Sequence, residues 1–267
     1  MVGTDRDAAI ALSDAFCKPR VERGDMTARE CLADRTNEDH GFLMYHRIGA
    51  DALANAKPAS SAGHNGGYQW GIHRYSSSLP LGFAGQLEIH PEGDQITLLH
   101  EYWHSMQMSF IHRTDHQIRK KQMGPVRFSE GSAVAMAEIT AENLWATGRL
   151  SRAASQGHPW PNFKQRMINK MNFIQEKIQD CDSVLPDTYE GVDGRLAYKS
   201  GGWAVAYLLY RHGRGVLCER FHPRVAELGW EGAFQKTFGQ TSTQFIEEFK
   251  GFLGLPLEKQ IEILPKF

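Results

Sequence analysis

The sequence lacks the features that mark several large classes of protein. No apolar run approaches the roughly 20 residues of a membrane-spanning helix, and the first residues lack the apolar core of a secretion signal. The net charge of -1 gives no basic excess for binding nucleic acid. The 4 cysteines are widely scattered, without C-x-x-C spacing. We therefore expect a cytoplasmic protein with reduced thiols, and neither nucleic acid nor a membrane among its partners.

Internal repeats and low-complexity tracts are also lacking, so the chain is expected to be one enzyme-sized unit. Its 267 residues suffice for a sizeable core. We predict two lobes of a single catalytic unit. Residues 1–127 form a lobe with strands and a metal-binding helix, and residues 128–267 form a helical lobe. The sequence does not indicate the oligomeric state.

The segment HEYWH, from His100 to His104, is the most informative one, because H-E-x-x-H on a helix builds a hydrolytic zinc site. Histidines four residues apart lie on one helical face, so both imidazoles can reach one metal ion. Composition alone gives about 0.04 chance occurrences of this pattern in the chain. The segment predicts His100 and His104 as metal ligands, with Glu101 beside the remaining coordination position.

The surrounding sequence predicts the secondary structure that such a motif needs. Asp94 is a predicted N-cap, and the apolar positions that follow it predict a helix running to about Thr114. Before this helix, Phe83 to His90 is predicted to be an edge strand. Two further strands are predicted at Phe42 to Ile48 and Tyr68 to Tyr75.

A catalytic zinc ion usually has three protein ligands and one water, so a third ligand has to be found. Six residues after His104, where one class of zinc enzymes has its third histidine, the chain has Phe110. His112 and His116 would point away from the first pair on one straight helix. The isolated histidines of the N-terminal half are more typical of surface or hydrogen-bonded side chains: His64, His73 and His90.

Glu130 is the best candidate for the third ligand. It lies in FSEGSA, which opens a second helical run with a small-residue surface, so two helices can approach closely. The alternative is that Glu130 only complements the helix N-terminus, with Ser129 as N-cap. Glu138 and Glu142, further along the same helix, are weaker candidates.

HEYWH followed by SEGSA resembles the gluzincin branch of the zinc metallopeptidases, the peptidases of MA-like type. In that branch a glutamate in an N-E-G-x-A type segment, which corresponds to Glu130, completes the site. YKSG, from Tyr198 to Gly201, resembles the Y-x-K-G segment of the aminopeptidase-N and leukotriene-hydrolase group. The resemblance extends over roughly Phe83 to Leu253.

The resemblance implies an α+β zincin-like fold, in which a small twisted sheet packs on the H-E-x-x-H helix and the C-terminal lobe is mostly helical. It also implies that Tyr198 donates a hydrogen bond to the oxyanion of the tetrahedral intermediate. One position departs from the pattern. Val134 stands where thermolysin-like relatives have an acidic residue that orients a ligand histidine, so another group has to orient the imidazoles here.

The expected function is zinc-dependent hydrolysis of a peptide or related amide bond. Zn²⁺ bound by His100, His104 and Glu130 would lower the pKa of a water molecule toward about 7, and Glu101 would accept its proton. Other readings remain open. The same residues suit a small-molecule hydrolase that opens an epoxide, an iron-dependent oxygenase, or a binding module without activity. The substrate is accordingly expected to be a peptide or a small molecule.

Overall fold

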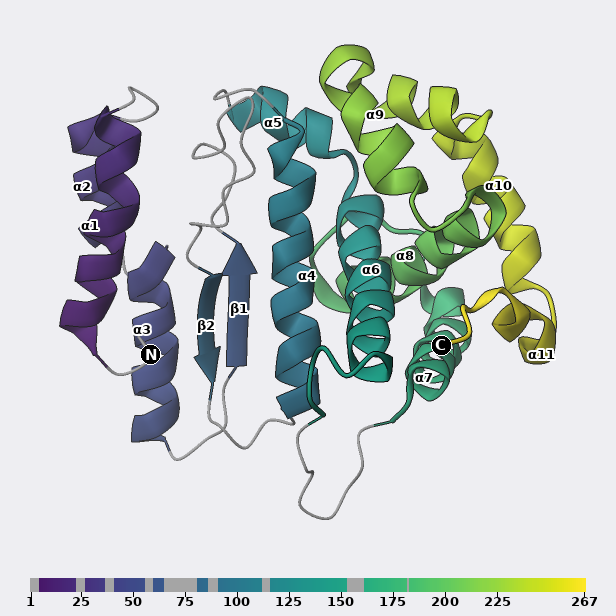
Figure 1. Ribbon diagram of the computed structural model, residues 1–267, viewed down its shortest axis with the longest axis horizontal. Helices are drawn as coiled ribbons and strands as arrows, with labels where there is room; N and C mark the ends of the chain where they lie inside the picture. Colours follow the sequence, from purple (N-terminus) through teal and green to yellow (C-terminus); the bar gives the residue numbers. More distant parts are fainter. Residues whose placement is uncertain are drawn as a thin grey trace. The chain divides into compact units, whose positions relative to one another are not determined.

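The structure is a computed structural model of the whole chain. It describes residues 5–22, 27–36, 41–55, 60–64, 81–85, 91–111, 116–152, 161–181 and 183–267. The chain divides into two compact units, Met1–Thr114 and Asp115–Phe267 (Figure 1). The H-E-x-x-H motif belongs to the first unit, and Glu130 and Tyr198 belong to the second.

The first unit combines helices with one ribbon of two strands. Its described elements are α1 (Arg6–Glu22), α2 (Ala28–Thr36), α3 (Gly41–Ala54), β1 (Ser60–His64), β2 (Leu81–Gly85) and α4 (Pro91–Ser109). The strands pair antiparallel, with Ser60 opposite Gly85. The ribbon lies between α3 and α4 (Figure 1). Ala9 of α1 and Leu43 of α3 are buried together, and Met108 of α4 packs against them.

The expected α+β zincin fold is wrong. About 80% of the described residues are helical, and the two-stranded ribbon is the only strand pairing among them, so no twisted sheet of the expected kind supports the motif helix. Phe42 to Ile48, a predicted strand, lies in α3, where buried Leu43 and half-buried His46 and Ala50 follow helical spacing. A short apolar run does not distinguish a strand from a buried helical turn, which explains the error.

Of the other two predicted strands, the structure describes only the first residues of one. Residues 68–75 lie outside the described residues, as do residues 86–90. The first part of the strand predicted at Phe83 to His90 falls in β2, which begins at Leu81 and ends at Gly85.

The second unit is helical throughout its described part. Its elements are α5 (His116–Met123), α6 (Val126–Ala146), α7 (Phe163–Lys177), η1 (Ile178–Asp180), α8 (Gly191–His212), η2 (Leu217–Phe221), α9 (His222–Phe238), α10 (Ser242–Leu253), α11 (Leu257–Gln260) and η3 (Ile261–Ile263). An aromatic cluster forms much of its core: Phe128, Phe221, Trp230, Phe234, Phe238, Phe245, Phe249 and Phe252. The side chains of Thr241 and Asn162 cap the starts of α10 and α7.

Close packing of α6 on α8 depends on glycine at their crossing point. A Cβ atom on Gly201 would collide with the carbonyl oxygen of Arg127, and one on Gly131 would collide with the backbone of Gly201. A Cβ atom on Gly202 would come within 2.8 Å of Val134 Cγ1. The backbones of these two helices therefore lie in direct contact near Glu130.

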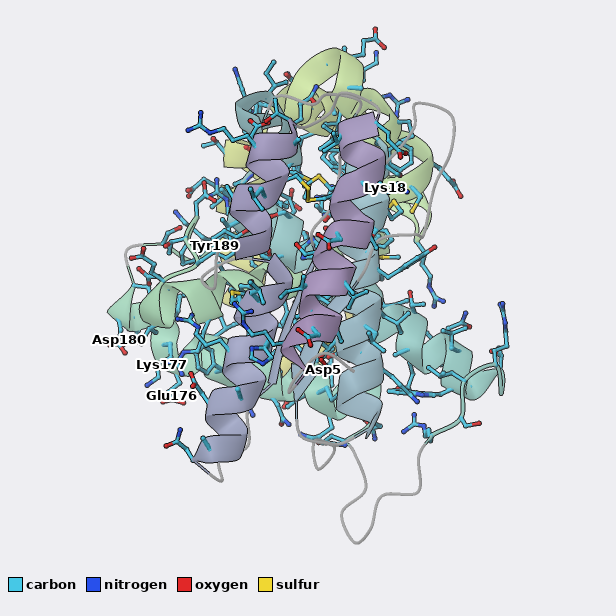
Figure 2. All side chains as sticks on the ribbon, turned by 90° about the vertical axis from the view of Figure 1, so that its left-hand side faces the viewer. Asp5, Lys18, Glu176, Lys177, Asp180 and Tyr189 are labelled. Carbon is cyan, nitrogen blue, oxygen red and sulfur yellow. A yellow bond between two sulfur atoms is a disulfide. The ribbon has the colours of Figure 1, made fainter. Side chains whose placement is uncertain are left out.

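Cys17 and Cys31 form a disulfide that links α1 to α2, visible as the sulfur–sulfur bond in Figure 2. Their Cα atoms are 5.5 Å apart, within the usual range for a disulfide. The expectation of reduced thiols is thus wrong for these two cysteines. Among the described helices, none is both long enough and apolar enough to cross a membrane.

Candidate metal centre

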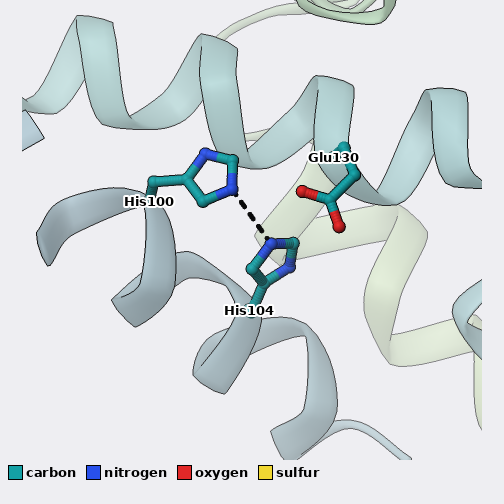
Figure 3. Close-up of side chains that lie close together, drawn as sticks. All are labelled: His100, His104 and Glu130. Atoms are coloured by element: carbon teal, nitrogen blue, oxygen red, sulfur yellow. Dashed lines mark hydrogen bonds between the residues drawn. The ribbon is translucent and has the colours of Figure 1, made fainter. Parts of the chain in front are cut away.

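Helix α4 presents His100 and His104 as a pair. Their Nε2 atoms are 3.1 Å apart and share a hydrogen bond, and the rings meet edge to face (Figure 3). The motif is therefore on a helix, as predicted, and both imidazoles face the same point. The helix begins at Pro91, three residues before the predicted N-cap, because proline is well suited to the first turn of a helix.

Gln107 orients one of these imidazoles. Its Oε1 atom is 2.8 Å from Nδ1 of His104, and its side chain is buried one helical turn further along α4. An amide oxygen can only accept a hydrogen bond, so neutral His104 carries its proton on Nδ1 and keeps the lone pair of Nε2 toward His100. Gln107 thus provides the orienting group that the sequence lacks at Val134, and the sequence analysis missed it.

Glu130 lies in the first turns of α6 and is only 6% exposed. Phe128, two residues earlier, packs against Trp230 and Phe234 on another side of the helix, and this contact fixes the rotation of α6. The helix begins at Val126 after Pro125, so Ser129 lies inside the helix and is not its N-cap. The reading of Glu130 as a partner of a Ser129 cap is therefore wrong.

His100, His104 and Glu130 together offer the donors of a metal centre. One ligand atom from each residue lies within 4.8 Å of the others (Figure 3). Two nitrogens bound tetrahedrally to zinc at about 2.0 Å are about 3.3 Å apart, close to the observed separation of the Nε2 atoms. Two imidazoles and one carboxylate also form a known ligand set of catalytic zinc. These residue types suit a divalent metal ion.

Tyr189 contacts Glu130 within the second unit. Its hydroxyl donates a hydrogen bond to Oε1 of Glu130 over 3.1 Å. Partial burial of the hydroxyl, followed by the charge of Glu130, raises the pKa of Tyr189 to about 12, although most of the residue is exposed. The phenol is therefore protonated at neutral pH and available as a donor. Because 59 residues separate Tyr189 from Glu130, no sequence spacing indicated this contact.

The two predicted catalytic residues, Glu101 and Tyr198, lie on α4 and α8. Glu101 of α4 is 8% exposed, and a carboxylate is rarely buried without a structural or chemical role. Tyr198 is half-buried in α8, and its ring centroid is 6.4 Å from that of Tyr189. Because α8 begins at Gly191, Tyr198 lies about two turns inside the helix.

The weaker candidates for the third ligand are engaged elsewhere. Glu138 accepts a hydrogen bond from Arg166 over 2.6 Å and pairs with Lys170, and Glu142 pairs with Arg152 and Arg166. This buried network fastens α6 to α7 and leaves Glu130 as the glutamate of α6 that is grouped with the histidines.

Among the described residues, no further histidine is grouped with these ligands. Helix α4 ends at Ser109 and α5 begins at His116, so the assumption of one straight helix through both pairs was wrong. The residues at positions 73, 90 and 112 lie outside the described residues, and His64 lies in β1.

Comparisons with models of protein families, with curated proteins and with solved structures found no match for this chain.

Proposed function

We propose that this chain is a zinc-dependent hydrolase that cleaves a peptide or related amide bond. The observation that carries the proposal is the grouping of His100, His104 and Glu130, whose ligand atoms lie within 4.8 Å of one another. Two imidazoles and one carboxylate are a ligand set that catalytic zinc uses. Glu101, between the two histidines, adds the base that hydrolysis requires.

Each residue of the site has a defined task in this proposal. His100, His104 and Glu130 hold the ion, and Gln107 keeps the Nε2 lone pair of His104 available for it. A zinc ion bound there supplies a Lewis acid that polarises the substrate carbonyl and makes water more acidic. Glu101 accepts the proton of the attacking water and passes it to the leaving amine. Tyr198 is proposed to donate a hydrogen bond to the oxyanion, on the basis of its resemblance to the Y-x-K-G segment.

Substitution of Glu101 by Gln tests the proposal directly. The amide cannot accept a proton, whereas the three metal ligands are unchanged. We expect Glu101→Gln to retain about one zinc per chain and to lower kcat/KM by about 10²-fold to 10⁴-fold. Zinc would be measured by elemental analysis, and activity on a pool of fluorogenic peptides.

Glu176→Gln is the matched control, because Glu176 is an exposed carboxylate on α7 that pairs with its neighbour Lys177. It should leave both activity and metal content unchanged. Wild-type protein that takes up no zinc would refute the proposal. Glu101→Gln activity within a few-fold of wild type would refute the assignment of Glu101 as the base.

A further inference from the structure

The segment Ser183 to Glu190, which precedes α8, is held against the start of α6 by polar contacts. Asp187 accepts a hydrogen bond from the backbone N–H of Val126 over 2.6 Å, in the manner of an N-cap supplied from a distant part of the chain. Asp187 also lies 3.7 Å from the guanidinium of Arg127. At the other end of the segment, the hydroxyl of Ser200 donates to the carbonyl oxygen of Val184.

These contacts bring the hydroxyl of Tyr189 to Glu130. The hydroxyl of Tyr189 donates to one of the two carboxylate oxygens of Glu130, Oε1. The last torsion of a glutamate side chain is broad and roughly two-fold, so a carboxylate without a fixed donor samples many orientations. A donor on one oxygen restricts that rotation and so limits the orientations that the carboxylate can present to a metal ion.

We infer that Tyr189 is a positioning residue for the metal centre, because its hydroxyl holds the Glu130 carboxylate in the orientation that binds the ion. The inference rests on the proposed function in one respect, namely that Glu130 binds the metal. A preorganised ligand loses less rotational freedom when the ion binds, so metal affinity depends on the hydroxyl. Tyr189 acts through Glu130 and has no part in the proton transfers assigned to Glu101.

The test compares zinc affinity and folding stability in Tyr189→Phe, which removes only the hydroxyl. Tyr210→Phe is the matched control, because Tyr210 is as exposed as Tyr189 but lies near the end of α8. Zinc Kd would be measured by competition with a chromophoric chelator, and the melting temperature of each full-length protein in excess EDTA. We expect Tyr189→Phe to weaken zinc binding by about 10-fold to 100-fold, with the metal-free melting temperature almost unchanged. Tyr210→Phe should change neither quantity.

A third variant separates failure of this inference from failure of the proposed function. Glu130→Ala removes a ligand, and its zinc affinity should fall by more than that of Tyr189→Phe. If Glu130→Ala weakens binding while Tyr189→Phe binds zinc like wild type, the positioning role of Tyr189 is refuted and the metal site stands. If Tyr189→Phe loses melting temperature but not zinc affinity, Tyr189 only fastens the segment Ser183 to Glu190. If Glu130→Ala binds zinc as tightly as wild type, the ligand set is wrong, and the inference fails with it.

Discussion

Single hydrogen bonds prepare two of the three candidate ligands for a metal ion. Gln107 fixes the tautomer of His104, and Tyr189 fixes the carboxylate of Glu130. The two cases differ in how far the sequence could reveal them. Gln107 follows His104 by three residues on a predicted helix, so its side chain was within reach by helical geometry alone. Tyr189 depends on how α8 and the preceding segment pack on α6, which no local pattern encodes.

Replacement of Gln107 by Leu should weaken zinc binding by about 10-fold to 100-fold, because the Nδ1 proton of His104 loses its acceptor and the ring is no longer held in the binding tautomer. Leu is apolar and similar in size, so the buried site remains filled. Gln107→Glu keeps an acceptor and should bind zinc at least as tightly as wild type. Chelator competition measures both variants. Equal affinity for Gln107→Leu and wild type would show that Gln107 has no orienting role.

Helices α6 and α8 bring together two of the three segments on which the metallopeptidase resemblance depends. SEGSA lies on α6 and YKSG on α8, and Gly131 of the first meets Gly201 of the second. The small residues of SEGSA indicated that this helix could approach another one closely, and the close contact that Gly131 makes is with α8. The partner helix was not predicted, because small side chains show that a helix can approach another one closely but not which one.

The contact between α6 and α8 should not tolerate a methyl group at Gly201. In Gly201→Ala the new Cβ atom meets the carbonyl oxygen of Arg127, so the helices must separate, and the free energy of unfolding should fall by at least about 2 kcal/mol. Gly251→Ala is the matched control on α10, where a Cβ atom meets nothing within 4 Å. It should stabilise the protein by about 0.5–1 kcal/mol, since alanine has the higher helix propensity. Urea unfolding measures both, and unchanged stability of Gly201→Ala would contradict the close contact.

Secondary structure was predictable where the amphipathic pattern was long and regular, and not elsewhere. The apolar positions around His100 correctly predicted a helix, since several turns repeat the same pattern. The short apolar run at Phe42 to Ile48 gave the wrong element, and this error contributed to the wrong fold class. The resemblance at the motifs concerned the spacing of the metal ligands, which constrains one helix and its neighbour. It did not determine how the rest of the chain packs.

The two units of the molecule are stabilised by different means. In the first, the Cys17–Cys31 disulfide joins α1 and α2, a pairing that the spacing of the four cysteines did not predict. In the second, the aromatic cluster encloses His222 at the start of α9, where its side chain is 6% exposed and its ring meets that of Phe221. Because an apolar core disfavours the charged form of a histidine, His222 makes the free energy of unfolding depend on pH.

Burial lowers the pKa of His222 from 6.5 to about 3, so its imidazole is neutral in the folded protein at any pH above that value. Between about pH 3 and 6.5 the unfolded chain binds a proton at this residue and the folded chain does not. The free energy of unfolding should therefore fall as the pH decreases below about 6.5, by up to about 1.4 kcal/mol per pH unit from this group. Burial also lowers the pKa of His212, which contributes in the same direction.

In His222→Gln the pH dependence of the free energy of unfolding should become shallower but not vanish. Urea unfolding at pH 7.5, 6.0 and 5.0 in excess EDTA, which removes any effect of metal release, measures it. An equally steep loss of stability in wild type and His222→Gln would mean that other groups determine the acid sensitivity of the second unit.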